Sequence, residues 1–312
     1  MPTGSQGSIR LFGFSGIDVF LHWSWFLLAY YEINARRGNY SSIVWNVIEY
    51  LALFLIVTLH EFGHALACRQ VGGQANQIVL WPLGGVAYVD PPQRPGATLW
   101  SIAAGPLVNV ALFPLLLVLL RLSSGRTAVS PDAHALLWFL TWRIDLGLLV
   151  FNMLPIYPLD GGQILRSLLW FVLGRGRSLM IATVLGFVGV AGFIGLAFLK
   201  RDGLLGAVAV FMLLNCWGGL RHAQALLRFA KLPRQEGFAC PACKTKPPIG
   251  DFWKCGRCGQ AFDTFQTHAV CPHCATQFAM TKCLDCGAAH PMSEWAPSVI
   301  SASSTFADQV RG

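Results

Sequence analysis

The chain has little charge for its length. Asp, Glu, Lys and Arg make up 12% of its 312 residues, about half of the roughly 25% that is usual in soluble domains. This scarcity argues against an ordinary soluble enzyme. Hydrophobic residues make up 54% of the chain and fall in long blocks, which indicates a membrane protein.

The chain also lacks a polybasic tract and the pattern of a cleaved signal peptide. The net charge of +8 is not gathered in a polybasic tract, so the composition gives little support to nucleic acid as a partner. The N-terminus, MPTGSQGSIRLFGFSG, lacks the basic, apolar and small-residue order of a cleaved signal peptide. The first apolar stretch runs instead into an aromatic-rich span.

The apolar blocks set the expected fold class. A bilayer core of about 30 Å needs roughly 20 residues of apolar helix. We predict six spans, near residues 18–35, 46–68, 98–121, 134–156, 179–199 and 204–228. Residues 74–90, around a PLGG turn, predict a short membrane-associated β-hairpin. The expected fold is therefore an α-helical polytopic membrane protein with about six transmembrane helices, this hairpin and a small C-terminal zinc-ribbon domain.

The distribution of basic residues favours one orientation. With both termini inside, the inner side holds ten Lys and Arg residues and the outer side six. Basic residues concentrate on the cytoplasmic side of membrane proteins, so we expect cytoplasmic termini in the cell (inner) membrane. The cysteine pairs of the tail, whose spacing favours metal sites over disulfides, agree with a reducing compartment.

The second predicted span contains the segment HEFGH, with His60, Glu61 and His64. Residues i and i+4 share one face of a helix, so two such imidazoles can chelate one zinc ion while the glutamate polarises a water on it. A chance histidine pair on a core helix is the alternative. Three ionisable groups so close together in an apolar span are costly, and such groups are functional by default.

Two histidines leave a catalytic zinc site one protein ligand short. The best candidate is Asp160, in the segment NMLPIYPLDGG at residues 152–162. This carboxylate follows a helix that Pro155 and Pro158 break, and it could reach the metal from a neighbouring helix. From these residues alone, an ordinary turn at LDGG is an equally good interpretation.

Together the two segments resemble the site-2 protease family of intramembrane zinc metalloproteases. The resemblance extends to HWSW at 22–25, PLGGVA at 82–87 and AGP at 104–106 with Asn109, and covers most of residues 8–230. It implies that His60, His64 and Asp160 bind a catalytic zinc. It also implies that Glu61 is the general base and that Asn152 holds the substrate or the tetrahedral intermediate.

One position departs from the family pattern. Many relatives carry an asparagine seven residues before Asn152, where this chain has Asp145, with Arg143 two residues away. Residues i and i+2 do not share a helix face, so each is expected to find its partner on another helix. A buried ion pair or a snorkelling arginine is favoured over a direct catalytic role.

The hairpin offers a way to present a substrate. An exposed strand edge can pair with an extended peptide through main-chain hydrogen bonds, and the predicted substrate-binding residues are Leu83, Gly84, Gly85 and Val86. The alternative is a surface hairpin without a catalytic role. His22, early in the first span, is expected to be packed or interfacial, with a gating role as the alternative.

Four Cys-x-x-Cys pairs follow residue 239: Cys240/Cys243, Cys255/Cys258, Cys271/Cys274 and Cys283/Cys286. Four thiolates form a closed, structural zinc site, so eight predict two structural zinc ions. Sequential pairing into tandem zinc ribbons over 236–292 is favoured over an interleaved cross-brace, and a redox role is disfavoured. Residues 1–235 then form the protease domain, and 293–312 a disordered tail.

We therefore expect an intramembrane zinc endopeptidase with one catalytic and two structural zinc ions. Its substrate would be a single-span, membrane-anchored regulatory protein, by family resemblance, with the ribbons contacting a protein partner. A non-catalytic membrane scaffold or sensor with a zinc-ribbon module is the alternative. A metal transporter is the third reading, although polar residues cluster here at one site rather than along several helices.

Overall fold

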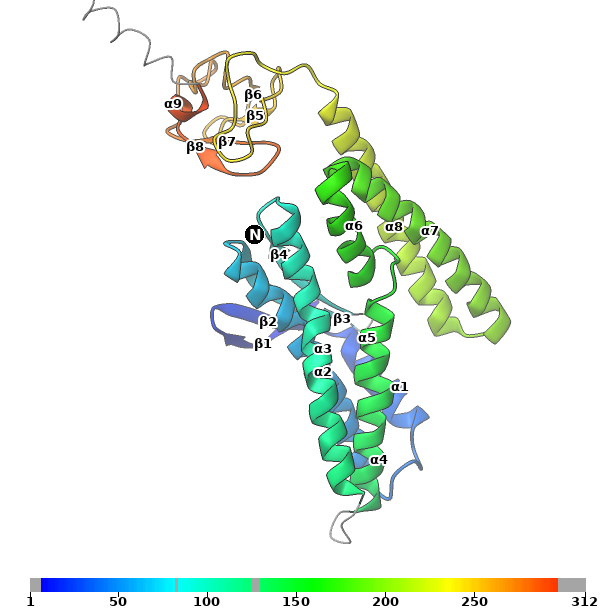
Figure 1. Ribbon diagram of the computed structural model, residues 1–312. Coiled ribbons are helices and arrows are strands. Elements are labelled where there is room, and N and C mark those ends of the chain that lie inside the picture. Colours follow the sequence, from blue (N-terminus) through cyan, green and yellow to red (C-terminus); the bar gives the residue numbers. More distant parts are fainter. Residues whose placement is uncertain (1–6, 82–83, 125–129, 297–312) are drawn as a thin grey trace, which may run out of the picture. The chain divides into compact units, whose positions relative to one another are not determined.

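The computed structural model describes residues 7–81, 84–124 and 130–296. The chain divides into two compact units, Met1–Leu226 and Leu227–Gly312 (Figure 1). The predicted boundary at 235/236 lies a short distance after this division, and residues 234 and 235 contact the second unit. There Arg234 pairs with Asp285 at 2.8 Å, and Gln235 donates to Asp263 at 3.0 Å.

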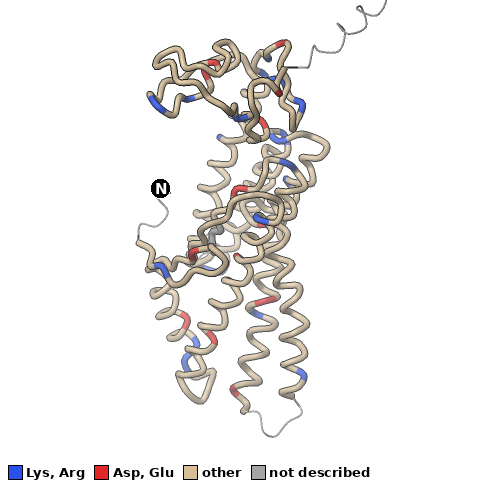
Figure 2. Tube along the Cα trace, turned by 90° about the vertical axis from the view of Figure 1, so that its left-hand side faces the viewer, with Lys and Arg blue, Asp and Glu red and all other residues tan. Residues whose placement is uncertain are grey.

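Five helical segments in the described chain are long and apolar enough to cross a membrane. They are α2 (Ile43–Gln70), α3 (Pro95–Ser123), the continuous segment Pro131–Asn152, α7 (Arg175–Lys200) and α8 (Gly203–Ala230). The third of these comprises α4 (Pro131–Phe139), the π-helix η2 (Leu140–Asp145) and α5 (Leu146–Asn152). They correspond to predicted spans two to six, and charged residues are sparse along them (Figure 2). The chain is a multi-pass membrane protein.

The first predicted span is wrong as a single helix. Its residues form strand β2 (Ile17–His22) and helix α1 (Ser24–Ala35), and the 12 residues of α1 rise only about 18 Å. The aromatic-rich run has the hydropathy of a span, but the backbone of β2 is paired with two neighbouring strands. Hydropathy alone does not register that pairing.

Residues in and around this strand and helix nevertheless contact α2 at several positions. Arg69 donates to the backbone oxygens of Ser15 and Gly16, and Tyr50 donates to the backbone oxygen of Trp25 at 2.8 Å. Further along, Arg36 donates to Glu49 at 3.0 Å. Glu49 and Arg69 are twenty residues apart, about 30 Å along the helix, so the segment from Ser15 to Arg36 contacts α2 at points that far apart.

The predicted hairpin is half of a four-stranded sheet. Strands β1 (Ser8–Phe14), β2, β3 (Gln74–Trp81) and β4 (Gly84–Asp90) lie in that order, with β2 and β3 parallel and the other pairs antiparallel. The inner strand β3 buries Ile78 and Leu80 in a core shared with Phe62 of α2. Among the described strands β4 is an edge, paired only with β3.

Helix α6 (Asp160–Leu173) follows an irregular segment, 153–159, that packs against α7 and α8. Small residues allow this close approach. A Cβ atom on Gly161 would lie 2.4 Å from the backbone oxygen of Met153, and one on Gly189 would lie 2.6 Å from the side chain of Ile156. The first turn of α6 is therefore held against the preceding segment, which fixes the position of Asp160.

The second unit contains two small hairpins, β5 (Trp253–Lys254) with β6 (Ala261–Phe262) and β7 (Thr281–Lys282) with β8 (Ala289–His290), followed by α9 (Met292–Trp295). Trp253, Phe265 and Trp295 pack with the cysteines in one core. Trp295 is 1% exposed, so the disordered tail cannot begin at 293. Residues 297–312 lie outside the described residues.

Candidate metal centres

His60 and His64 project from one face of α2 toward a common point. Their Nε2 atoms lie 3.1 Å apart, and both side chains are buried. Asp160, the first residue of α6, places its Oδ2 atom 3.1 Å from His60 Nε2 and 3.4 Å from His64 Nε2. The three predicted ligands, from two different helices, are thus brought together.

The spacing of these atoms fits a zinc ion. Tetrahedral zinc with bonds of about 2.0–2.1 Å to nitrogen and oxygen requires ligand atoms about 3.3–3.4 Å apart. The three observed separations, 3.1, 3.1 and 3.4 Å, are close to that value. Two imidazoles and one carboxylate also form the donor set of a catalytic zinc site, which keeps one position open.

Contacts behind the imidazoles fix their orientation. His60 Nδ1 lies 2.6 Å from Asn109 Oδ1, and Asn109 Nδ2 donates to Asp145 at 2.7 Å. His64 Nδ1 lies 2.9 Å from the backbone oxygen of Ser101. Because both partners of the histidines are acceptors, each Nδ1 carries the proton and each Nε2 lone pair points to the metal position.

Asp145 is the last residue of the π-helix η2. It is fully buried, and its partner is Asn109 on α3, as expected of a residue bonded to another helix, although the contact is a hydrogen bond and not an ion pair. Short π-helical stretches inside α-helices often mark functional sites. Here η2 ends at Asp145, whose carboxylate accepts a hydrogen bond from the Asn109 amide, and that amide in turn contacts His60.

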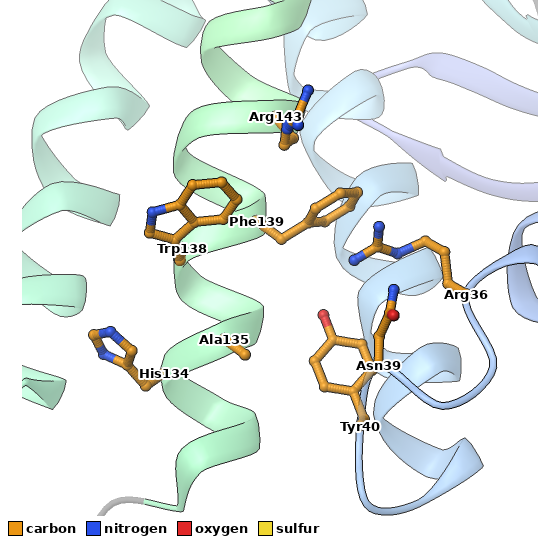
Figure 3. Close-up of a pocket in the computed structure, with 8 residues that line it drawn as sticks. All are labelled: Arg36, Asn39, Tyr40, His134, Ala135, Trp138, Phe139 and Arg143. Atoms are coloured by element: carbon orange, nitrogen blue, oxygen red, sulfur yellow. The ribbon is translucent and has the colours of Figure 1, made fainter.

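Arg143, on the same π-helix, is exposed and pairs with no acidic residue in the described chain. It lines a cavity of about 640 Å³ together with residues of the α1–α2 connection and α4 (Figure 3). Arg36, in the same cavity, lies 3.6 Å above the ring of Phe139. Arg143 and Asp145 thus face different surroundings.

Glu61 and Asn152 complete the group of predicted catalytic residues. Glu61 follows the first histidine on α2 and is buried. Asn152, the last residue of α5, has its amide nitrogen 3.5 Å from His60 Nε2. A hydrogen-bond donor and a carboxylate therefore lie next to the three convergent ligands.

The sequence analysis did not identify the role of Gly105. A Cβ atom at this position would lie 2.2 Å from His64 Nε2, and one on Gly63 would lie 2.7 Å from the backbone oxygen of Ala104. Small residues let membrane helices approach closely, and here the approach of α2 and α3 makes room for an imidazole. In the sequence, the AGP motif at residues 104–106 was the indication of this close approach.

Known proteins share this architecture. The solved structure of a site-2 protease from Methanocaldococcus jannaschii matches with a TM-score of 0.52 and 30% identity, over 68% of this chain and 95% of that chain. The profile of Peptidase family M50 matches residues 48–134 and 125–196. The chain belongs to peptidase family M50, the site-2 proteases.

Two curated sequences give the extent of the similarity. A zinc metalloprotease of M. jannaschii is 35% identical over 179 residues, which are 57% of this chain and 50% of that protein. The stage IV sporulation protein FB of Bacillus subtilis is 33% identical over 117 residues, 37% of this chain and 38% of that protein. The M50 chain thus spans half or less of the length of these two relatives.

The predicted substrate-binding residues fall on β4 and the turn before it. Leu83 lies outside the described residues, and Gly84, Gly85 and Val86 pair with Trp81, Leu80 and Val79 across the hairpin. The ring of His22, at the end of β2, stacks on Trp81 with centroids 3.9 Å apart. His22 is therefore a packed residue, as expected.

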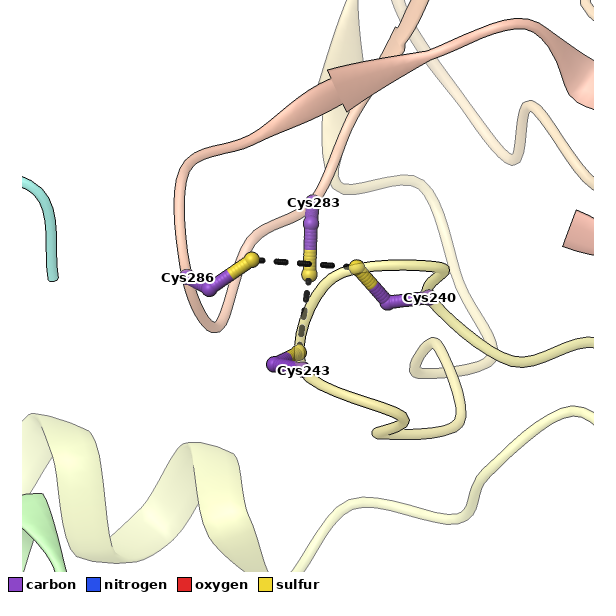
Figure 4. Close-up of side chains that lie close together, drawn as sticks. All are labelled: Cys240, Cys243, Cys283 and Cys286. Carbon is purple, nitrogen blue, oxygen red and sulfur yellow. Dashed lines mark hydrogen bonds between the residues drawn. The ribbon is translucent and has the colours of Figure 1, made fainter. Parts of the chain in front are cut away.

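The cysteines of the M50 chain form two further candidate metal sites, but not the sequential pairs that we predicted. Cys240 and Cys243 join Cys283 and Cys286, with sulfur separations of 3.7 and 3.8 Å (Figure 4). The other four, Cys255, Cys258, Cys271 and Cys274, form the second group at 3.5 and 3.7 Å. The second group is nested within the first.

Both cysteine groups fit zinc. A tetrahedral site with zinc–sulfur bonds of about 2.3 Å requires sulfurs about 3.8 Å apart, and none of the ten cysteines forms a disulfide. The prediction of pairing failed because four similar Cys-x-x-Cys segments do not specify their partners. The shared core of Trp253, Phe265 and Trp295 joins the two ends of the unit and makes it one domain.

Proposed function

We propose that this M50 chain is an intramembrane zinc endopeptidase that hydrolyses peptide bonds in or near transmembrane segments. The observation that carries the proposal is the convergence of His60, His64 and Asp160 on one point beside α2, a helix of membrane-spanning length. A structural site would be closed by a fourth protein ligand. Within the described chain this group contains three, which leaves a position for water and substrate.

The surrounding residues have the chemistry of a peptidase. Zinc, when bound, supplies a Lewis acid that polarises the scissile carbonyl and acidifies water. In this proposal Glu61 takes a proton from water and returns it to the leaving amine. Asn152, with its amide 3.5 Å from His60 Nε2, donates a hydrogen bond to the substrate carbonyl oxygen.

The edge strand β4 is the proposed docking position for the substrate. A transmembrane helix shields its peptide bonds through its own hydrogen bonds, so it must be unwound before cleavage. An extended segment can then add to a free strand edge. Gly84, Gly85 and Val86 lie at the start of this edge, and membrane-anchored regulatory proteins with one span are the proposed substrates.

The proposed orientation follows from the distribution of basic residues. With both termini on one side of the membrane, that side holds ten Lys and Arg residues and the other side six. The excess of basic residues assigns that side to the cytoplasm. The cysteine domain then lies in a reducing compartment, where its thiolates can bind zinc, and it is the proposed contact surface for a protein partner.

The test is a paired measurement of zinc content and cleavage. The wild type and Glu61→Gln are purified in detergent and assayed against a panel of single-span membrane proteins. We expect cleavage by the wild type only, with equal zinc content in both proteins. Cleavage by Glu61→Gln at the wild-type rate would remove Glu61 from the mechanism. A wild type that cleaves no member of the panel would favour the scaffold or sensor function.

A further inference from the structure

A cluster of basic and aromatic side chains lies where α6, α7 and α8 come together. It consists of Arg166 and Trp170 on α6, Arg175 at the start of α7, and His222 on α8. The guanidinium carbons of Arg166 and Arg175 each lie 5.8 Å from the centre of the Trp170 ring. Both arginines also act electrostatically on His222, so three basic groups share one small region.

Arg166 has no counter-ion in the described chain. The charged or ionisable groups that act on it are the Tyr157 hydroxyl and Arg175, and neither is a carboxylate. Among the residues that the structure describes, none accepts a hydrogen bond from its buried Nε atom. The positive charge of Arg175 acts on Arg166, and like charges repel more strongly at a protein surface than in bulk water, so an anion beside Arg166 would stabilise its guanidinium group.

The cluster lies at the expected boundary of the membrane. The apolar run of α8 ends at Leu220, and Arg221 and His222 follow. Helix α6 has 14 residues, about 21 Å of rise, which is too short to span a bilayer. Tryptophan and arginine gather at the level of the lipid headgroups, and Trp170 meets both arginines there.

The same helix presents an apolar surface next to the basic groups. Leu168, Phe171 and Val172 are 51%, 59% and 84% exposed. A helix with basic residues on one side and large apolar residues on the other suits the membrane interface. A ligand with both a phosphate and acyl chains matches both parts of this surface, whereas free phosphate matches only the first.

We propose that Arg166, Arg175 and His222 bind the phosphate of an anionic phospholipid headgroup, with Trp170 beside it and the acyl chains against α6. Arginine binds phosphate through two parallel hydrogen bonds. Basic pockets between membrane helices on the cytoplasmic side are suited to anionic headgroups. The bound lipid would fasten α6, the helix that also carries Asp160, to the headgroup layer.

The test compares lipid binding by the full chain and its variants. Delipidated protein is titrated with phosphatidylglycerol or phosphatidylcholine in mixed micelles, and bound lipid is counted by native mass spectrometry. We expect about a tenfold preference for phosphatidylglycerol in the wild type and its loss in Arg166→Gln/Arg175→Gln. The matched control Arg177→Gln/Arg221→Gln removes the same charge from exposed positions nearby and should keep the preference.

Three results would overturn the proposal. The first is a wild type without preference, and the second is an equal loss in the control, which would indicate diffuse attraction to charge. The third is displacement of the lipid by millimolar inorganic phosphate, which would identify a free anion as the ligand. If Arg166→Gln/Arg175→Gln does not fold, His222→Gln, at an exposed position, replaces it, with an expected loss of about threefold.

Discussion

The side-chain amide of Asn109 donates a hydrogen bond to Asp145 at 2.7 Å while its oxygen lies 2.6 Å from His60 Nδ1. The carboxylate can only accept, so it fixes the amide with its nitrogen toward η2 and its oxygen toward the histidine. Asp145 therefore supports a metal ligand from a distance. Contacts of this kind typically contribute ten- to a hundredfold to metal affinity.

This relay gives the first prediction. Asp145→Leu leaves the amide of Asn109 without an acceptor, so we expect zinc affinity at the histidine site to fall by about ten- to a hundredfold. Asp145→Asn retains an acceptor oxygen and should lie within about threefold of the wild type. Competition with a zinc chelator measures both. Equal affinities for Asp145→Leu and the wild type would contradict the relay.

Gly105→Ala should selectively remove the zinc held by the histidines. The added Cβ atom would lie 2.2 Å from His64 Nε2, so the imidazole must move away from the metal position. We expect one zinc fewer per chain, with the cysteine-bound zinc unchanged. Gly147→Ala, where a Cβ atom meets nothing within 4 Å, is the control and should keep full zinc. Full zinc in both variants would show that the imidazole tolerates the methyl group.

If β4 is the docking edge, the loss of cleavage caused by proline substitutions should alternate along the strand. Successive backbone N–H groups of β4 face β3 and the free edge in turn. Single proline substitutions from Gly85 to Val89 should therefore reduce cleavage most at every second position, by about tenfold where a substrate hydrogen bond is lost. Zinc content is measured in parallel to identify misfolded variants. Unchanged cleavage at all five positions would exclude β4 as the docking edge.

The nested cysteine pairing is tested by counting zinc in double variants. Cys240→Ser/Cys286→Ser disrupts one site in the nested arrangement, whereas Cys240→Ser/Cys255→Ser disrupts two. We expect losses of one and two zinc ions per chain, respectively. Sequential pairing predicts the reverse, so elemental analysis of the two purified proteins decides between the arrangements.

Much of the membrane unit could be predicted from the sequence. Hydropathy located the five long helices, and the His-Glu and Asp-Gly-Gly segments identified the groups that converge. The first span was wrong because an apolar run has the same hydropathy in a strand as in a helix. The strand β2 forms through pairing with β1 and β3, and β3 lies more than fifty residues further along the chain.

The supporting contacts and the cysteine groups were harder to predict. Asn109 and Asp145 stood out as polar residues in apolar spans, but 36 positions separate them, and only the packing of α3 against η2 brings them together. The partners of the Cys-x-x-Cys pairs depend likewise on a core that Trp295 completes. Contacts between residues so far apart in the sequence follow from the fold and not from the local spacing of residues.

The central claim, that His60, His64 and Asp160 hold a zinc ion, is tested most directly by metal stoichiometry. Zinc per chain is measured in the wild type, Asp160→Ala and Glu61→Gln by elemental analysis of protein purified in detergent. The account predicts three, two and three zinc ions, respectively. Two zinc ions in all three proteins, all held by the cysteine domain, would contradict it.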